Sequence, residues 1–295
     1  MRDDSPSRTA AFVAAARQLG QLLPESARLV DDPYGAAFAS PAAGKWLDRE
    51  SDRLRPLAAL PGMRQWILYM QVRTRVIDDA LRAFLAGGGA QLVVLGAGYD
   101  CRALRLPELA GALVLEVDHP ATQGRKRSVL DRIGARSHAH YVTWDFESRA
   151  MEDLPDVLDE AGLDLAAPVF TIWEGVTMYL TEPAIDASLR AIRAWSAPGS
   201  QVALTYFAKS RIERPSLITR AMKAVVATFG EPWKFGWAPD ELPAYLAARR
   251  FSLVRDIALA DAARDLLPAD LAAHVANADR RFALAAAHES VAVVS

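Results

Sequence analysis

The chain has 295 residues and a single cysteine, Cys101, and this scarcity excludes several kinds of protein. One thiol can build neither an internal disulfide framework nor a cysteine-rich zinc site. Without any sign of an oxidising environment, a cytoplasmic setting is the default expectation. The five histidines are scattered and show no ligand spacing, so we expect no metal site.

The chain also has little net charge and no long apolar run. The 34 Lys and Arg residues nearly balance the 36 Asp and Glu residues, so nothing favours a nucleic-acid partner. No window approaches the roughly 18–20 unbroken apolar residues of a membrane span. The N-terminal apolar stretch Ala10–Ala16 ends at Arg17 and lacks the pattern of a signal peptide. We therefore expect a globular protein without a membrane partner, and no feature of the sequence favours one oligomeric state.

The first ninety residues contain no strand candidate and predict helices. The predicted helices cover Thr9–Gln18, the surroundings of Ala36–Phe38, and Met63–Leu85. In the third of these, apolar residues recur at close to the helical period of 3.6. The triple glycine at 87–89 then ends it, as glycine commonly does at a helix C-terminus.

After these glycines, short apolar runs alternate with stretches that predict helices. The runs are Gln91–Leu95, Ala112–Val117, His140–Trp144, Pro168–Trp173 and Gln201–Phe207. The helical stretches between them are Ala121–Arg132, Met151–Glu160 and Ala184–Trp195. Continuous apolar strands that alternate with helices predict an α/β fold, with a parallel sheet covered on both faces.

The remainder of the chain predicts an insertion and two further strands. Residues 208–250 are rich in arginine, proline and aromatics, with a predicted helix over Ser216–Phe229 and another short helix after Asp240. The insertion also contains the aromatic residues Trp233, Phe235 and Trp237. Phe251–Ile257 and Ser290–Val294 are predicted to form an antiparallel pair of strands at the edge of the sheet. No linker is visible, so we expect a single domain over residues 1–295.

Glycine or an acid follows each of the first four predicted strands. In order along the chain these are Gly96-Ala97-Gly98, Asp118, Asp145 and Glu174. In an open parallel sheet, ligands bind at the carboxyl ends of the strands. The sequence therefore predicts a ligand site at this edge.

The glycine loop narrows the choice of ligand. A nicotinamide-binding loop has a third glycine that helps to seat a pyrophosphate, and Cys101 stands at that position here. A loop with only Gly96 and Gly98 suits a ligand without a pyrophosphate, such as S-adenosylmethionine. Asp118 is then placed to bind ribose hydroxyls, and Asp145 to reach the adenine amino group. The alternatives are a plain turn at the glycines and acids that only cap the next helices.

Several segments resemble a known family in their order along the chain. They are ARLVDDPYGAAF (27–38), VRTRVIDD (72–79), LVVLGAGYDCRALRL (92–106), LEVDHPATQGRK (115–126), WDF (144–146), WEGVTMYLTE (173–182) and GEPWKFGW (230–237). Together they resemble the S-adenosylmethionine-dependent methyltransferases that include leucine carboxyl methyltransferases, and especially the bacterial branch with polyketide-type O-methyltransferases.

This resemblance implies a fold, a cofactor and a division of the chain. The implied fold is the doubly wound, seven-stranded sheet of class I methyltransferases, mostly parallel with an antiparallel C-terminal edge pair, and the implied cofactor is S-adenosyl-L-methionine. The implied parts are a helical N-terminal cap (1–90), a cofactor-binding core (91–207), a lid insertion (208–250) and C-terminal strands (251–295).

The resemblance also assigns roles to residues that would bind the cofactor. The residues are Arg17, Arg73, Gly96, Ala97, Gly98, Asp118, Asp145, Phe146 and Glu174. The glycine loop would line the methionyl group, Asp118 would bind the ribose, and Asp145 and Phe146 would flank the adenine. Glu174 would meet the amino-acid end. Arg73 would pair with the methionyl carboxylate, with Arg75 as the other candidate, and Arg17 would close over the same end.

One departure from the family bears on the methyl acceptor. The leucine carboxyl branch is expected to hold a substrate carboxylate with an arginine shortly after the third-strand acid. Here Glu147 would repel a carboxylate and Arg149 is offset. With the aromatic insertion, this favours O-methylation of a small-molecule hydroxyl or carboxyl group, in secondary metabolism.

Alternatives stay open at this stage. They are carboxyl methylation of a protein C-terminus, a nicotinamide-dependent oxidoreductase, and a non-catalytic module that binds S-adenosylmethionine. Tyr179 and Tyr206 are the candidates for contacting the acceptor, and either could equally be a packing residue.

Overall fold

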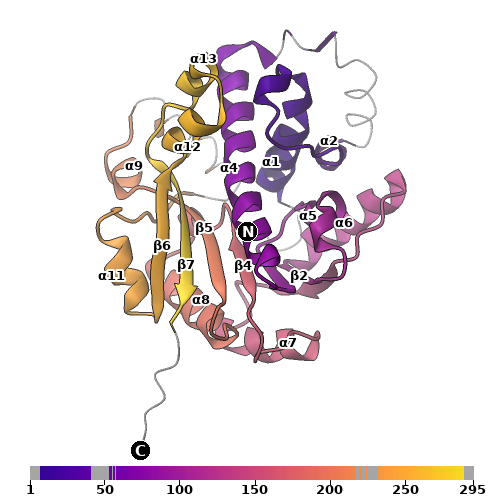
Figure 1. Ribbon diagram of the computed structural model, residues 1–295, viewed down its shortest axis with the longest axis vertical. Coiled ribbons are helices and arrows are strands. Elements are labelled where there is room, and N and C mark those ends of the chain that lie inside the picture. Colours follow the sequence, from indigo (N-terminus) through magenta and orange to yellow (C-terminus); the bar gives the residue numbers. More distant parts are fainter. Residues whose placement is uncertain are drawn as a thin grey trace, which may run out of the picture.

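A seven-stranded sheet lies at the centre of the computed structural model, in the order β3-β2-β1-β4-β5-β7-β6 (Figure 1). The described residues are 7–40, 53, 54, 56, 58–216, 219, 220, 223, 224, 227 and 232–288. The strands are β1 Gln91–Leu95, β2 Leu113–Asp118, β3 His140–Thr143, β4 Phe170–Trp173, β5 Gln201–Phe207, β6 Phe251–Ala258 and β7 Arg280–Ala287. The first five strands pair in parallel, and β7 runs antiparallel to both β5 and β6. This confirms the predicted mostly parallel sheet with an antiparallel C-terminal pair.

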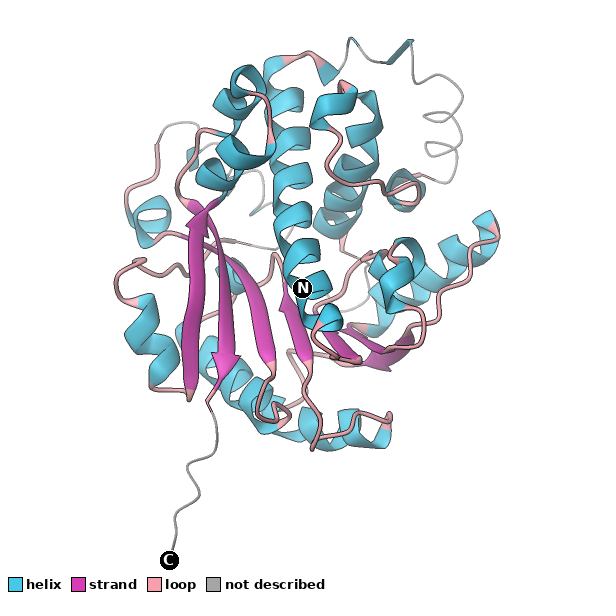
Figure 2. Cartoon of the chain, in the orientation of Figure 1, coloured by secondary structure: helices cyan, strands magenta, loops and turns pink. Residues whose placement is uncertain are grey.

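Helices cover both faces of this sheet (Figure 2). The α-helices are α1 Arg8–Gln18, α2 Gly35–Ala39, α4 Pro61–Ala86, α5 Arg102–Arg105, α6 Pro120–Ile133, α7 Leu154–Glu160, α8 Glu182–Ala194, α9 Lys209–Glu213, α11 Leu242–Ala247, α12 Leu259–Leu266 and α13 Ala269–Ala272. Short 3-10 helices are η1 Leu19–Leu22, η2 Glu25–Ala27, η3 Pro107–Leu109, η4 Met151–Asp153, η5 Thr177–Tyr179 and η6 Ala273–Val275. The predicted helix at 151–160 is thus split between η4 and α7.

The apolar strands supply two hydrophobic cores, because successive side chains of a strand point to opposite faces. On one face, Leu92 and Val94 of β1 pack in a cluster with residues of α4, α12 and α13. On the other face, Val93 and Leu95 pack in a cluster with residues of α7, α8 and α11. All five residues of β1 are therefore buried, which explains why the run shows no polar alternation.

Helix α4 is the longest described helix, with 26 residues, and it brings polar side chains to the edge of the sheet. It begins at Pro61, whose missing N–H costs nothing in a first turn, and its C-cap is Gly87. Its apolar stripe, which includes Ile67, Met70 and Leu81, is fully buried. The same buried side carries Arg73 and Asp78.

The C-terminal part differs from the prediction of strands alone. Helices α12 and α13 lie between β6 and β7, and the second C-terminal strand is Arg280–Ala287. The predicted strand Ser290–Val294 lies outside the described residues. The β-branched residues of Ser290–Val294 favour a strand locally, whereas β7 contains several alanines, which favour a strand only where they are closely packed. Ala283 and Ala285 are fully buried there.

The aromatic part of the insertion is held against the end of the sheet. The Lys234 N–H donates a 2.7 Å hydrogen bond to the Met178 carbonyl, and the Lys209 N–H donates one of 2.9 Å to the Trp237 carbonyl. Trp237 also forms an isolated bridge with Ala208, directly after β5. Most of the predicted helix Ser216–Phe229 lies outside the described residues. Within the described part of the chain, no helix is both long and apolar enough to cross a membrane.

Candidate active site

The predicted edge residues come together where three neighbouring parallel strands end. Strands β2, β1 and β4 lie side by side, so Asp118, the glycine loop and Glu174 share one edge of the sheet. Positions 96 and 98 of the loop favour glycine for conformational reasons, because φ is +70° at Gly96 and +52° at Gly98. A Cβ on Gly96 would also lie 2.7 Å from a methyl carbon of Val176.

Asp118 ties the glycine loop to the end of β2. Its Oδ2 accepts a 2.5 Å hydrogen bond from the Gly98 N–H, and its Oδ1 accepts one of 2.6 Å from the His119 N–H. Burial raises the pKa of this carboxyl, and the two N–H donors oppose that shift. Each carboxylate oxygen retains a further lone pair, so Asp118 can still accept hydrogen bonds from a ligand.

Glu174 lies between two buried arginines. The Nε atom of Arg73 lies 2.7 Å from Oε1, and Nη2 of Arg102 lies 3.0 Å from Oε2. Burial alone would raise the pKa of Glu174, but the guanidiniums of Arg73 and Arg102 outweigh it and hold the pKa at about 2. Glu174 is therefore ionised at neutral pH.

Further charged residues behind this group were not predicted. Arg102 Nε donates a 2.8 Å hydrogen bond to Asp78, and Arg105 binds both carboxylate oxygens of Asp78 at 2.7 and 2.9 Å. Asp100 accepts a 2.6 Å hydrogen bond from the Arg102 N–H and contacts its guanidinium. The sequence did contain a hint of this cluster, because Arg102 and Arg105 are three residues apart and share one side of a helix. The sequence did not show that their partner acid is Asp78, which comes from α4.

A comparison with known families places the chain in one of them. Residues 10–193 match the family model described as leucine carboxyl methyltransferase, which covers more than half of the chain. The chain belongs to the leucine carboxyl methyltransferase family. It is an S-adenosylmethionine-dependent methyltransferase, as the sequence predicted, and its cofactor is S-adenosyl-L-methionine.

Bacterial relatives share much of the methyltransferase sequence. A protein of Mycobacterium sp. (strain KMS), provisionally named an S-adenosyl-L-methionine-dependent methyltransferase, is 38% identical over 208 residues, covering 68% of this chain and 67% of the relative. A similarly named protein of Streptomyces coelicolor is 39% identical over 215 residues, covering 70% and 71%. A solved DUF574 family protein from Streptomyces avermitilis has a TM-score of 0.58 at 17% identity, covering 93% and 96% of the two chains. The last likeness shows the fold alone.

The buried charges fit the amino-acid end of this cofactor. Arg73 Nε, Arg102 Nη2 and Glu174 Oε1 are buried, lie at ion-pair distance, and lack the alignment of a hydrogen bond with any described group. An α-carboxylate would give the arginines an aligned acceptor, and an α-ammonium would give Glu174 an aligned donor. The methyltransferase therefore has a site whose polarity matches a methionyl group.

Of the two candidate arginines on α4, only Arg73 reaches this site. Arg75 pairs instead with Asp79 at 2.8 Å, and these two side chains are 37% and 43% exposed. Arg17 lies close by, but over the glycine loop: its guanidinium donates to the Tyr99 carbonyl at 2.5 Å and to Asp32 at 2.7 Å. These contacts clamp α1 onto the loop.

Asp145 and Phe146 lie at the far end of the same edge, after β3. The carboxylate of Asp145 accepts hydrogen bonds from the Glu147 N–H at 3.0 Å and the Ser148 hydroxyl at 2.6 Å. These bonds lower the pKa of Asp145. Phe146 is 37% exposed. The structure thus shows Asp145 closing its own turn, and leaves the adenine role of both residues a prediction.

The two candidate tyrosines have different surroundings. The Tyr206 hydroxyl donates to Asp256 at 2.9 Å and accepts from Arg281 at 3.0 Å, and the residue is 1% exposed. Burial and the neighbouring Asp256 raise the pKa of the Tyr206 hydroxyl. The hydroxyl therefore stays protonated at neutral pH and is a poor general base. Tyr206 is not brought to the Arg73–Glu174 group and has the contacts of a packing residue. Tyr179 is half-buried and packs against the cluster of Met178, Phe207 and Trp233.

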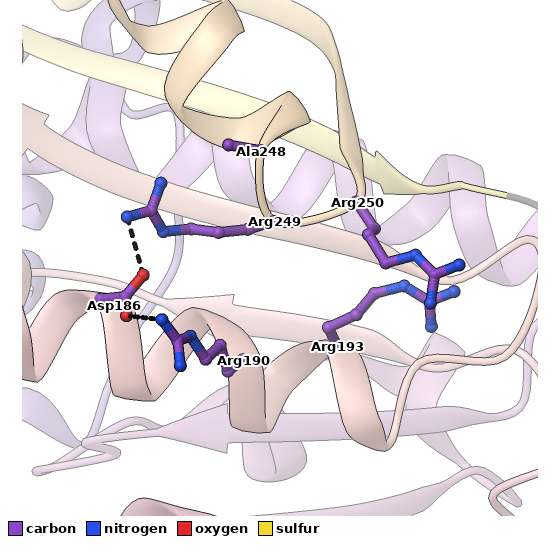
Figure 3. A pocket seen from close by; sticks show the side chains of 6 residues that line it. All are labelled: Asp186, Arg190, Arg193, Ala248, Arg249 and Arg250. Carbon is purple, nitrogen blue, oxygen red and sulfur yellow. Dashed lines mark ion pairs between the residues drawn. The ribbon is translucent and has the colours of Figure 1, made fainter.

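A separate surface pocket of roughly 390 Å³ lies at the opposite edge, near the end of α8 (Figure 3). Its charged lining residues are Asp186, Arg190, Arg193, Arg249 and Arg250. Asp186 pairs with Arg190 at 2.6 Å and with Arg249 at 2.7 Å. None of the predicted site residues lines it. Within the described residues, no group of three or more His, Cys, Asp or Glu side chains is arranged to hold a metal ion.

Proposed function

We propose that this methyltransferase methylates an oxygen of a small-molecule hydroxyl or carboxyl group, as a step of secondary metabolism in the cytoplasm. The observation that carries the proposal is the buried group of Arg73, Glu174 and Arg102 beside the glycine loop, because it matches a methionyl zwitterion. Arg73 would hold the α-carboxylate, Glu174 the α-ammonium and Asp118 the ribose hydroxyls.

Positioning is the main task of the chain in such a transfer. When bound, S-adenosylmethionine supplies a methyl group on a positively charged sulfur, and the departing thioether is neutral and needs no acid. Buried ion pairs and the close approach of the backbone at Gly96 would fix the cofactor, and exclude water from it. A carboxylate acceptor would need no base, whereas a hydroxyl acceptor would benefit from one.

Two features support a small molecule over a protein C-terminus as acceptor. Glu147 would repel a carboxylate and Arg149 is offset in the sequence from the expected carboxylate-binding arginine, with its Cζ atom 3.7 Å from the centre of the Trp144 ring. The aromatic insertion is packed against the sheet edge, with Trp233 6% exposed and edge-on to Phe207. Tyr179, on the same cluster, is the candidate for contacting the acceptor.

Titration of the purified protein with S-adenosylhomocysteine tests the cofactor site, with NADH as the control ligand. We expect micromolar affinity for the first and none for the second. Asp118→Ala should abolish binding of S-adenosylhomocysteine, because it removes the acid that holds Gly98 and faces the ribose. Asp79→Ala, which removes an exposed acid of α4, should leave the affinity unchanged. Equal affinity of the Asp118 variant and the wild type would contradict the assignment.

A transfer assay with methyl-labelled S-adenosylmethionine tests the acceptor class. The panel contains phenols, carboxylic acids and a peptide that ends in leucine. Mild alkali releases methanol from methyl esters and leaves methyl ethers intact, which separates carboxyl from hydroxyl products. Labelling of a small molecule supports the proposal, and labelling of the peptide alone favours the protein C-terminus. Cofactor binding without any transfer would favour a non-catalytic module.

A further inference from the structure

Arg211 and Arg280, which lie beyond the Arg73–Glu174 group, have no acidic partner among the described residues. Arg211 of α9 is 2% exposed, and its Nε and Nη1 atoms are buried without a hydrogen-bond acceptor in the described chain. Arg280, the first residue of β7, is half-buried, and its Nε atom is likewise buried and unbonded. Unpaired buried donors are costly and need an explanation, and an acceptor on a bound molecule is one that suits two adjacent guanidiniums.

Aromatic rings cover the faces of these guanidiniums and leave their edges unsatisfied. The Arg211 Cζ atom lies 4.9 Å from the centre of the Phe207 ring and 5.2 Å from that of Trp233. The Arg280 Cζ atom lies 4.1 Å from the centre of the Tyr69 ring. Ring contacts stabilise a cation through its face, whereas the N–H donors of a guanidinium lie in its plane. The rings therefore do not replace an acceptor.

The charge of this pair is not neutralised within the described residues. Burial and the nearby Arg280 lower the pKa of Arg211 to about 10, and Asp279 opposes the shift without forming an ion pair with it. Burial and the charge of Arg73 lower the pKa of Arg280. Arg102, by contrast, is paired with Asp78, Asp100 and Glu174. Arg211 and Arg280 thus form a buried pair of positive charges without an acidic partner among the described residues.

The order of the strands places this pair next to the methionyl site. Asp118 ends β2 and Glu174 follows β4, whereas Arg280 begins β7 opposite Phe207, the last residue of β5. Tyr69 connects the two places, because it lies one turn before Arg73 on α4. Its ring centre is 5.7 Å from the Arg73 Cζ atom and 4.1 Å from that of Arg280. The unpaired arginines therefore border the methionyl site on the side away from the ribose.

We propose that Arg211 and Arg280 form a carboxylate subsite for the methyl acceptor, which is an aromatic small-molecule acid. The planar guanidinium edges match the two oxygens of a carboxylate, and the neighbouring rings offer contacts to an aromatic carbon skeleton. This inference rests on the proposed function and adds the class of acceptor and the residues that select it.

The test compares aromatic acids with neutral molecules of the same shape. Benzoate, phenylacetate and 1-naphthoate, and the amide of each, are titrated calorimetrically into the protein saturated with S-adenosylhomocysteine. For at least one pair, we expect the carboxylate to bind about tenfold or more tightly than its amide, because hydrogen bonds between charged groups are lost in the amide. Arg211→Gln and Arg280→Gln should each remove that preference without changing the affinity for S-adenosylhomocysteine.

Arg190→Gln is the matched control, because it removes one positive charge from a side chain that is 71% exposed. It should keep the preference for carboxylates. Equal binding of acids and amides, or absence of binding by all three acids, would overturn the subsite, and neither result depends on a folded variant. Loss of the preference in Arg190→Gln as well would also overturn it. Failure of S-adenosylhomocysteine to bind the wild type would instead contradict the proposed function.

Discussion

At the scale of single residues, the sequence correctly placed the acids and glycines at the edge of the sheet, but it did not decide whether Arg73 or Arg75 faces the site. Arg73 and Arg75 are two residues apart on α4, so they point to sides about 200° apart. Which side faces the site depends on Glu174, which follows β4 far along the chain. Arg102, Asp100 and Asp78 were missed for the same reason, because their roles arise only when α4 and the glycine loop pack together.

The difference between these arginines predicts contrasting variants. Arg73→Gln removes the cation next to Glu174 and should weaken S-adenosylhomocysteine binding by about 1.5–3 kcal/mol, typical of hydrogen bonds to charged groups. Arg75→Gln breaks only an exposed pair with Asp79 and should change binding by less than about 0.5 kcal/mol. Calorimetric titration measures both. A larger loss in the Arg75 variant would reverse the assignment.

At the scale of elements, the positions of the first five strands could be predicted from the local sequence pattern. The C-terminal helices and the strand β7 could not. The first five strands begin and end within two residues of their predicted bounds, because each is a short run rich in apolar residues, and a glycine or acid marks the end of the first four. Strand β7 contains small residues that are buried between β5 and β6. Its identity as a strand comes from pairing on both sides, which no local propensity expresses.

The N-terminal cap offers a prediction at this scale. A Cβ on Gly35 of α2 would lie 1.9 Å from the Ala14 carbonyl oxygen of α1, so Gly35→Ala should push the two helices apart. We expect the free energy of unfolding to fall by about 1–3 kcal/mol, as in overpacked cores. Binding of S-adenosylhomocysteine should also weaken, because α1 covers the glycine loop through Ala10 and Arg17.

Gly62→Ala is the matched control for this substitution. Gly62 lies in the exposed first turn of α4, and a Cβ there would meet nothing within 4 Å. Alanine should therefore stabilise the protein by up to about 1 kcal/mol through a lower entropy of the unfolded chain. Denaturant unfolding followed by circular dichroism measures both variants. A stable Gly35→Ala protein with unchanged ligand affinity would show that the cap is not tightly packed.

At the scale of the whole molecule, the near-zero net charge conceals a strongly charged interior. The composition balances on average, yet the edge of the sheet concentrates buried acids and bases that pair with one another. Lys126 and Glu116, each 1% exposed, form a further pair beneath the glycine loop, and Lys126 also donates to the Asp100 carbonyl. Composition could predict neither the pairs nor the excess charge at Arg211 and Arg280, because both depend on which side chains are removed from water together.

This buried charge makes stability depend on pH in a defined window. The pKa of Glu174 is lowered from 4.5 to about 2 in the folded protein, so its ion pairs stabilise the fold above pH 4.5. That contribution, of about 3 kcal/mol at most, is lost as the pH falls from about 4.5 to 2. Glu174→Gln should be less stable than the wild type at pH 7, because two buried guanidiniums lose a partner.

The difference between the two proteins should therefore shrink as the solution is acidified. Urea unfolding at several pH values between 7 and 2 measures it, with Glu160→Gln, a change at an exposed acid of α7, as the control. The control curve should run parallel to that of the wild type throughout. If the Glu174 variant and the wild type also lost stability in parallel below pH 4.5, the acid whose ionisation opposes acid unfolding would be a different one. Asp100 would then be the next acid to replace, because Arg102 and Lys126 lower its pKa despite its burial.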